Sequence, residues 1–351
     1  MGYYERSLQK AETLRLSESV RILAIETSCD ETAAAVVENG RVILSNAVFS
    51  QVYLHALYGG VVPEIASRSH VETLCRMTDA ALQEAGMAFD AIDAVAVTQG
   101  PGLAGALLAG ILYAKGLAFT LDKPLIPVHH IEGHICANYL TYPHLQPPFL
   151  CLVASGGHSH LYEVLKEGGY RLMGHTTDDA AGEAFDKAAR MLGLPYPGGP
   201  LLDALADHGD PAALPLPKAR TNNRYDYSFS GLKTAFINAL DRMTREGTKL
   251  PDTDLAASFR QAVVDALIEK AMLAAADTGA PALCLAGGVA CNRLLRSRLA
   301  QVCAAKGLPL MMPPPELCAD NAAMIGAAAY LRLRRGEIAP LTLNAEPGMA
   351  L

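Results

Sequence analysis

The sequence predicts an α/β protein made of two related lobes with a cleft between them. A strand followed by a hairpin occurs in each half of the chain, and a strand–glycine loop–helix unit follows each hairpin in the same order. Such repetition is typical of a duplicated supersecondary unit, and the mixture of strands and helices indicates an α/β core. The length of 351 residues also corresponds to about two domains.

The first lobe is predicted from a hairpin signal and a glycine-rich turn. Its strands are expected at residues 22–25, 33–37, 41–45 and 94–98. Asn39-Gly40 separates the two hairpin strands, and both residue types tolerate positive φ in a two-residue turn. The strand at 94–98 ends in the turn 99–102, and an apolar helix is expected from Leu103.

The second lobe repeats this layout and adds an insertion. Its strands are expected at residues 149–153, 160–165 and 282–286, with helices at 179–192, 255–276, 292–300 and 321–331. We expect residues 1–20 to form a polar, loosely ordered N-terminal extension. Residues 21–128 with about 325–345 would form the N-terminal lobe, and residues 129–324 the C-terminal lobe with an insertion at about 176–260.

Composition and charge limit the function classes. The net charge of -7 predicts no general nucleic-acid-binding surface, so an RNA contact would need local basic patches or a partner. The eight cysteines show no C-x-x-C spacing, which argues against a zinc ribbon and a thioredoxin-type redox pair. Scattered thiols in a large acidic domain fit a reducing cytosol better than a disulfide framework. The chain shows neither a signal peptide nor an apolar run long enough to span a bilayer. We therefore expect a cytoplasmic protein without membrane contact.

His130 and His134 form the most informative local motif. Residues four apart lie on one face of a helix, so two imidazoles there can bind one cation with a third ligand from elsewhere. A histidine pair without a metal is the alternative. A zinc peptidase of the H-E-x-x-H type is not predicted, because Glu132 lies roughly 200° around the helix from His130.

Asp320 is the candidate third ligand. It follows the run 313–315 of prolines and precedes the helix expected at 321–331, so it is either the N-cap of that helix or a metal ligand. Two histidines and a carboxylate with open coordination positions suit Zn²⁺ or Fe²⁺ acting as a Lewis acid.

Glycine-rich turns at strand ends suggest a nucleotide site. The turns 155–157, 198–199 and 287–288, with the acidic turn 29–32, would hold phosphate, ribose and base between the lobes. No Walker A or dinucleotide motif occurs. Asp186 either stabilises a helix N-terminus or accepts hydrogen bonds from a ribose.

Local basic character is confined to a few segments. It occurs at residues 218–224, at Lys233 and at residues 293–298. These residues could contact a phosphate backbone, although solvated helix faces have the same composition.

Ten ordered blocks of the sequence resemble one family, the tRNA N6-adenosine threonylcarbamoyltransferases (TsaD in bacteria, formerly described as O-sialoglycoprotein endopeptidases). The blocks are residues 25–32, 60–68, 100–103, 129–134, 155–158, 178–187, 196–200, 229–234, 286–289 and 320–321. The resemblance extends from about residue 22 to the low 330s, which is nearly the whole chain.

The resemblance implies an actin-like, sugar-kinase-like (ASKHA) fold with two duplicated RNase H-like lobes and a central cleft. It also implies transfer of the threonylcarbamoyl group of threonylcarbamoyl-adenylate to N6 of the adenosine just 3′ of the anticodon, position 37, in tRNAs that read codons beginning with adenine. We expect the chemistry to be metal-assisted acyl transfer with AMP as leaving group.

Site residues follow from the resemblance position by position. His130, His134 and Asp320 would hold one divalent metal per subunit, with Fe²⁺ favoured and Zn²⁺ as the alternative. The residues expected to bind the adenylate, or ATP or AMP, are Val153, Ala154, Ser155, Gly156, Gly157, Asp186, Gly199, Asp203 and Asn292. No general base is identified, and Asp30 and Glu31 are the catalytic candidates.

The resemblance implies several partners. They are tRNA, an inactive paralogous subunit of the TsaB type, a small ATPase of the TsaE type, and an upstream threonylcarbamoyl-adenylate synthase.

Two alternative functions stay open at the level of sequence: an ATP-hydrolysing or phosphoryl-transfer enzyme of the actin-like class, and a non-enzymatic scaffold. The scaffold would be expected to lack the histidine pair and the glycine turns, which are present here.

Overall fold

The computed structural model describes residues 2–219 and 221–351, and the chain divides into two compact units. The first comprises Met1–Leu145 and Asp320–Leu351, and the second comprises Gln146–Ala319. The observed boundary after Leu145 differs from the expected one at residue 128. The difference arises because the helix that carries the histidine motif packs against the last helix of the chain, within the first unit.

The first unit is built on a five-stranded sheet. Its strands are β1 (Arg21–Glu26), β2 (Glu31–Glu38), β3 (Val42–Ser50), β4 (Ala94–Gly100) and β5 (Leu125–His129), in the order β3-β2-β1-β4-β5. β1, β2 and β3 pair antiparallel, whereas β4 and β5 add parallel strands beside β1. Asn39 and Gly40 both have positive φ, which confirms the predicted hairpin turn.

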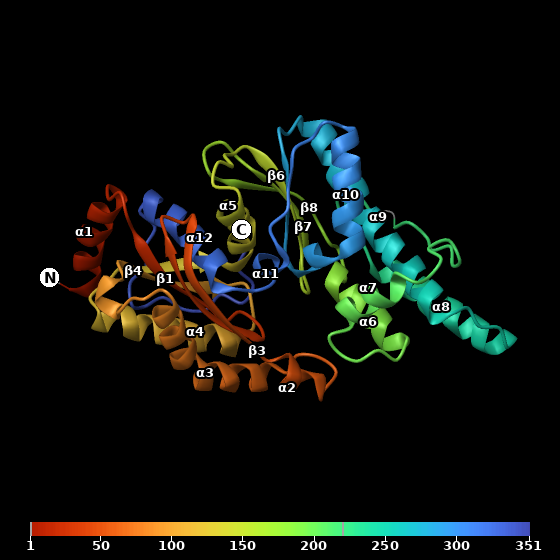
Figure 1. Ribbon diagram of the computed structural model, residues 1–351, viewed down its shortest axis with the longest axis horizontal. Helices are drawn as coiled ribbons and strands as arrows, with labels where there is room; N and C mark the ends of the chain where they lie inside the picture. The colour runs from red at the N-terminus through yellow and green to blue at the C-terminus, as the bar shows by residue number, and fades with distance from the viewer. Residues whose placement is uncertain (1, 220) are drawn as a thin grey trace. The chain divides into compact units, whose positions relative to one another are not determined.

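Helices cover this sheet in two groups. The helices of the unit are α1 (Tyr3–Arg15), α2 (Val52–Ala56), α3 (Pro63–Glu84), α4 (Ala104–Thr120), α5 (His130–Thr141) and α12 (Ala322–Arg335), with a 3₁₀ turn η1 (Phe89–Ala91). α12 packs on β1, β2 and α5, while α3 and α4 pack on each other and on the sheet. Figure 1 draws α12 on one side of the sheet and α3 and α4 on the other.

The first helix corrects an expectation. Residues 1–20 were expected to be loosely ordered, but Tyr3–Arg15 forms α1. The Tyr3 hydroxyl donates to the Lys123 carbonyl at 2.7 Å, and Lys10 pairs with Asp122 at 2.6 Å. α1 is therefore tied to the turn after α4 by polar contacts instead of a broad apolar face.

The second unit repeats the sheet of the first. Its strands are β6 (Phe149–Ala154), β7 (Ser159–Val164), β8 (Tyr170–His175), β9 (Leu283–Ala286) and β10 (Leu310–Met311), in the order β10-β9-β6-β7-β8. β6, β7 and β8 are antiparallel neighbours, and β9 and β10 continue in parallel from β6. This is the pairing pattern of the first sheet, so the predicted duplication is confirmed.

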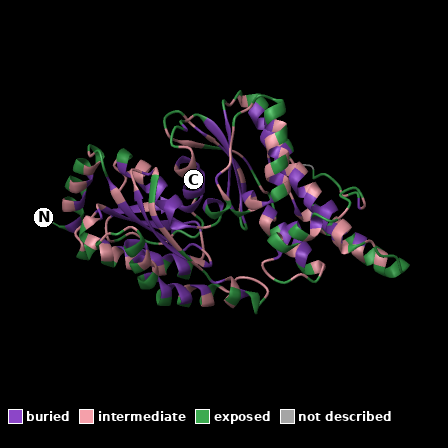
Figure 2. Ribbon diagram, viewed as in Figure 1, coloured by how far each residue is buried: buried purple, intermediate pink, exposed green. Residues whose placement is uncertain are grey.

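The predicted insertion supplies most helices of this unit. The helices are α6 (Ala181–Met191), α7 (Gly198–Ala206), α8 (Ser230–Glu246), α9 (Asp252–Thr278), α10 (Arg293–Ala305) and α11 (Pro315–Cys318), with a 3₁₀ turn η2 (Gly288–Cys291). The central strands and α9 are buried, whereas the far end of α8 is exposed (Figure 2). Within the described residues, no helix combines the length and apolar character needed to cross a membrane.

Candidate metal centre and nucleotide-binding residues

The histidine motif lies at the start of a buried helix. β5 ends at His129, and the His129 ring accepts a hydrogen bond from the backbone N–H of Ile131 at 3.1 Å, which caps α5. α5 then carries His130 and His134 on one face, both buried, with ring centroids 4.7 Å apart. The helical spacing predicted from the sequence is therefore present.

Asp320 joins the two histidines from a distant part of the chain. Its Oδ1 lies 3.2 Å from His134 Nε2 and 3.6 Å from His130 Nε2. One ligand atom from each of the three residues lies within 4.8 Å of the others. The N-cap of α12 is Asn321, whose side chain accepts a hydrogen bond from the Met324 N–H at 3.0 Å. The capping role considered for Asp320 thus belongs to its neighbour.

The donor atoms of this cluster fit a divalent cation. Neither ring nitrogen of His134 makes a hydrogen bond within the described residues, although both are buried. A buried polar atom without a partner is unfavourable, and a metal bond to Nε2 would remove that cost at one of the two nitrogens. Two imidazoles and one carboxylate leave coordination positions open, as catalytic Zn²⁺ and Fe²⁺ sites require.

Glu26 orients one of the candidate ligands. Its buried carboxylate lies 3.0 Å from His130 Nδ1 and accepts a hydrogen bond from the Thr98 hydroxyl at 2.7 Å. A carboxylate on Nδ1 directs Nε2 of the same ring toward a metal. Burial disfavours a charged imidazole, but the carboxylates of Asp320 and Glu26 outweigh burial and raise the pKa of His130 to about 9. The surroundings of His130 therefore favour a positive charge at its ring. No local sequence signal points to Glu26, which is 104 residues away from His130.

The acidic turn lies in the same unit as the histidines. Asp30 is buried, and Glu31 opens β2 and accepts a hydrogen bond from the Ser50 hydroxyl at 3.0 Å. Burial and the carboxylates of Asp30 and Asp320 raise the pKa of Glu31 to about 9. Of the two catalytic candidates from the sequence, Glu31 is thus electrostatically coupled to a candidate metal ligand, Asp320.

The glycine turn after β6 is held by α6 in the second unit. Val153 and Ala154 end β6, and residues 155–157 form the turn. The backbone N–H groups of Gly182 and Glu183 donate to the carbonyls of Ser155 (3.2 Å) and Gly156 (3.1 Å). Opposite this turn, Gly287 has φ +88°, and a Cβ there would lie 2.4 Å from the Ala154 carbonyl oxygen. Glycine is required at Gly287 because both the backbone angle and the space exclude a side chain.

Asp186 and Gly199 contact each other. Asp186 Oδ1 accepts hydrogen bonds from the backbone N–H groups of Gly198 and Gly199, each at 2.9 Å. Asp186 therefore holds the N-terminus of α7, a neighbouring helix, where a carboxylate is electrostatically favourable. Gly199 and Asp203 lie one turn apart on α7.

Asp203 lies at the centre of a buried polar network. Its side chain accepts hydrogen bonds from Arg260 Nη1 at 2.8 Å and from Asn292 Nδ2 at 2.9 Å. Asn292 also caps α10, because its side chain accepts from the Leu295 N–H at 2.9 Å. Sequence reasoning missed Arg260, whose position within the helix expected at 255–276 was visible in the sequence but whose burial was not.

The predicted basic segments are mostly paired with carboxylates. The ion pairs are Lys218–Glu269, Arg224–Asp277, Lys233–Asp179, Arg293–Asp207 and Arg298–Asp265. Arg220, in the expected segment 218–224, lies outside the described residues. Most of the positive charge expected to face a phosphate backbone is therefore partly neutralised within the protein.

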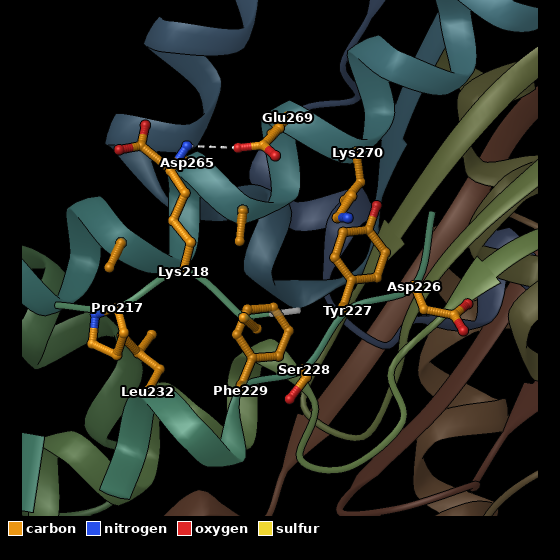
Figure 3. A pocket seen from close by; sticks show the side chains of 13 residues that line it. Pro217, Lys218, Asp226, Tyr227, Ser228, Phe229, Leu232, Asp265, Glu269 and Lys270 are labelled. Carbon is orange, nitrogen blue, oxygen red and sulfur yellow. Dashed lines mark hydrogen bonds and ion pairs between the residues drawn. The ribbon is translucent and has the colours of Figure 1, made fainter. Parts of the chain in front are cut away.

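A pocket in the second unit lies apart from the predicted site residues. It is lined by residues 217–219 and 226–229, by Leu232 of α8 and by residues of α9, as Figure 3 shows with the Lys218–Glu269 ion pair at its edge. None of the residues expected to bind the adenylate lines it.

Comparisons with solved structures agree with this fold. A T. kodakarensis HypF chain matches with a TM-score of 0.61 and 15% identity, covering 91% of this chain and 49% of that one. Component A of the (R)-2-hydroxyglutaryl-CoA dehydratase of Acidaminococcus fermentans matches with a TM-score of 0.52 and 13% identity, covering 90% and 99%. At these identities the likeness shows the fold alone. The fold is actin-like, as the sequence predicted.

Sequence comparisons identify the family. The family model described as "TsaD: tRNA N6-adenosine threonylcarbamoyltransferase" matches residues 42–327. A tRNA N6-adenosine threonylcarbamoyltransferase of Clostridium perfringens (strain SM101 / Type A) is 52% identical over 331 residues, which cover 94% of this chain and 98% of the relative. The Moorella thermoacetica enzyme of the same name is 53% identical over 337 residues, 96% and 98% of the two chains. The chain therefore belongs to the tRNA N6-adenosine threonylcarbamoyltransferase family.

Proposed function

We propose that this protein transfers the threonylcarbamoyl group of threonylcarbamoyl-adenylate to N6 of adenosine 37 in tRNAs that read codons beginning with adenine. The observation that carries the proposal is the identity of 52% over nearly the full length of a relative that bears this name. The candidate metal centre supports it, because acyl transfer gains from a Lewis acid at the oxygen that develops charge. Phosphoryl transfer has only the fold likeness in its favour.

His130, His134 and Asp320 are the proposed ligands of one divalent metal, with Fe²⁺ favoured and Zn²⁺ as the alternative. When bound, such an ion polarises a carbonyl or phosphoryl oxygen. Glu26 holds the tautomer of His130 that presents Nε2 to Asp320. Within the described part of the chain neither nitrogen of buried His134 makes a hydrogen bond, which supports this assignment.

The second unit is proposed to bind the adenylate through the ends of its strands and helices. Val153 and Ala154 lead into the turn Ser155, Gly156 and Gly157, which would present backbone N–H groups to an anion. Asp186 and Gly199 meet at the N-terminus of α7, and Asp203 and Asn292 meet at the N-terminus of α10. These contacts orient the groups and so reduce the entropy that binding the adenylate would cost.

Proton transfer is proposed to involve the acidic turn of the first unit. Asp30 and Glu31 are the candidates, because Asp30 is buried and half-buried Glu31 interacts electrostatically with both Asp30 and Asp320. The proposed partners are tRNA, a TsaB-type paralogous subunit, a TsaE-type ATPase and the synthase that supplies the adenylate. Because most basic side chains of the second unit are paired, we expect a partner to contribute to tRNA binding.

The test is nucleoside mass spectrometry of unmodified tRNA incubated with the protein, threonine, bicarbonate, ATP and the partner enzymes. The expected result is conversion of one adenosine per tRNA to its threonylcarbamoyl form. The double variant His130→Ala/His134→Ala is expected to give none, and His144→Ala, an exposed histidine of the same unit, to match the wild type. Full modification by a metal-free double variant, or transfer of γ-phosphate to a small hydroxylated molecule without tRNA modification, would contradict the proposal.

A further inference from the structure

Glu132, the acidic residue inside the histidine motif, is buried against α12. Its side chain is 1% exposed, its Oε2 accepts a hydrogen bond from Arg332 Nη1 at 2.9 Å, and its Oε1 accepts one from Arg335 Nη2 at 3.0 Å. Each carboxylate oxygen thus has its own guanidinium. Charge-assisted pairs of this kind are short and directional, so they restrict how α5 lies on α12.

The two helices are also in close backbone contact next to Glu132. A Cβ at Gly133 would lie 2.8 Å from Ile325 Cδ1 and 3.3 Å from Met324 Cγ. A side chain at Gly133 would separate the helices, so glycine there allows the close approach. The motif residues Glu132 and Gly133 therefore both belong to the interface between α5 and α12.

This interface connects the candidate ligands. Glu132 lies roughly 200° from His130 and roughly 160° from His134 around α5, on the side opposite the histidine face. Asp320 stands just before α12, whereas Arg332 and Arg335 lie in its last turn. α5 thus has polar contacts on two opposite faces. Its histidine face contacts Asp320, just before the start of α12, and the face with Glu132 contacts the last turn of α12. A rotation of α5 that follows loss of one attachment would displace the histidines from Asp320.

We propose that Glu132 is a positioning residue for the metal centre, acting through Arg332 and Arg335. This inference rests on the proposed metal site but not on the proposed transfer reaction. Removing the carboxylate charge leaves the mostly buried Arg332, 16% exposed, without its partner on α5. The two ion pairs that join the helices at this end are then lost, and the distances between the histidines and Asp320 become less well defined.

The test measures metal affinity of the full chain. Metal-free wild type and Glu132→Gln are titrated with Zn²⁺ in competition with a chromophoric chelator, and with Co²⁺ while its visible absorption is recorded. We expect the Kd for Zn²⁺ to rise about 10–100-fold in Glu132→Gln, as for other residues that orient metal ligands. The Co²⁺ spectrum is expected to change in position or intensity. Arg335→Met, which removes one of the two arginines, is expected to show a smaller change in the same direction.

Two control variants separate positioning from general destabilisation. Glu337 pairs with the same two arginines, with Arg335 at 2.5 Å and with Arg332 at 3.0 Å, but makes no polar contact with α5 among the described residues. Glu337→Gln keeps Glu132 and both of its ion pairs, so the Kd is expected to stay within about twofold of the wild-type value, less than the loss of an orienting residue causes. Leu299→Ala removes a buried side chain in the core of the second unit and lowers stability without touching α5. It is expected to leave both Kd and Co²⁺ spectrum unchanged.

Each outcome decides the inference. A folded Glu132→Gln with wild-type Kd and spectrum overturns it; if that variant fails to fold, a wild-type Kd in Arg335→Met does the same. The proposed function fails separately, because it fails when the wild type binds metal yet modifies no tRNA. In that case a higher Kd for Zn²⁺ in Glu132→Gln than in the wild type still supports the positioning role.

Discussion

The candidate metal centre of the first unit and the candidate nucleotide residues of the second differ in how far the protein satisfies them. Among the described residues, neither ring nitrogen of buried His134 makes a hydrogen bond, and the hydrogen bonds of His130 are made by Nδ1, on the side away from Asp320. Asp186, Asp203 and Asn292 are already hydrogen-bonded to backbone or side chains of their own unit.

The difference indicates two kinds of contribution to a site. An unsatisfied buried donor atom costs free energy until a ligand occupies it, so the first unit is prepared for a metal. A carboxylate that holds two helix ends together shapes a site whether or not a ligand is present. Variants in the first unit are therefore expected to affect metal content more than stability, and variants in the second to affect stability first.

The largest expected effect is on metal content. His134→Ala is expected to reduce bound metal from about one ion per chain to below a tenth, because a two-ligand remnant binds weakly. The unfolding free energy of the metal-free protein is expected to change by only about 1–2 kcal/mol, since no hydrogen bond is broken. Elemental analysis after dialysis and urea unfolding measure the two quantities. Stoichiometric metal in His134→Ala would remove the distinction between the units.

A large stability effect is expected in the second unit. Asp203→Ala is expected to lower the unfolding free energy by about 3 kcal/mol, because it breaks a buried ion pair of Arg260 and leaves Asp207 and the backbone carbonyl of residue 203 as the remaining partners of Arg260 Nη1. Metal content is expected to stay near the wild-type value. Asp241→Ala, at an exposed position on α8, is the matched control and is expected to cost less than about 0.5 kcal/mol. An unfolding midpoint in urea equal to that of the wild type would show that Asp203 has no such structural role.

The smallest expected effect concerns Asp178 and depends on pH. Partial burial opposes its ionisation, but hydrogen bonds from Ser228, Ser230 and the Phe229 N–H outweigh it and hold the pKa of Asp178 below its usual value. The carboxylate therefore stabilises the fold above its ordinary pKa, and this contribution disappears as the pH falls through the lowered value. Asp178→Asn is expected to cost about 0.5–1 kcal/mol at pH 7.

The measurement is the difference in urea midpoint between wild type and Asp178→Asn at several pH values. The difference is expected to be constant from pH 7 to about 5 and to shrink below about pH 4, near the unperturbed pKa of aspartate. A difference that grows on acidification would mean that the hydrogen bonds to Asp178 do not depend on its charge.

Features that depend on local sequence were predictable. The Asn39-Gly40 turn, the face shared by His130 and His134 and the duplicated strand order all follow from neighbouring residues or from repetition. The residue that caps α12 could not be identified from the sequence, because Asp320 and Asn321 are adjacent and both residue types cap helices well. Spatial evidence was needed to assign the cap to Asn321.

Features that join distant segments were not predictable from one sequence. Glu26 and His130 lie on different elements, and neither segment contains a signal for the other. The helix α1 was missed because its buried residues, Tyr3, Ser7 and Ala11, have helical spacing but little apolar character. The boundary of the first unit was misplaced for a related reason, since the packing of α5 on α12 is visible only in three dimensions.

The discontinuity of the first unit has a consequence for biosynthesis. Asp320 and α12 complete this unit, yet they are made after the whole of Gln146–Ala319, which forms the second unit by itself. During translation the second unit can finish folding while the first still lacks the helix that packs on its sheet and on α5. The complete set of candidate metal ligands therefore exists only after residue 320 has been made, so a nascent chain that stalls between residues 134 and 320 contains both histidines but not Asp320.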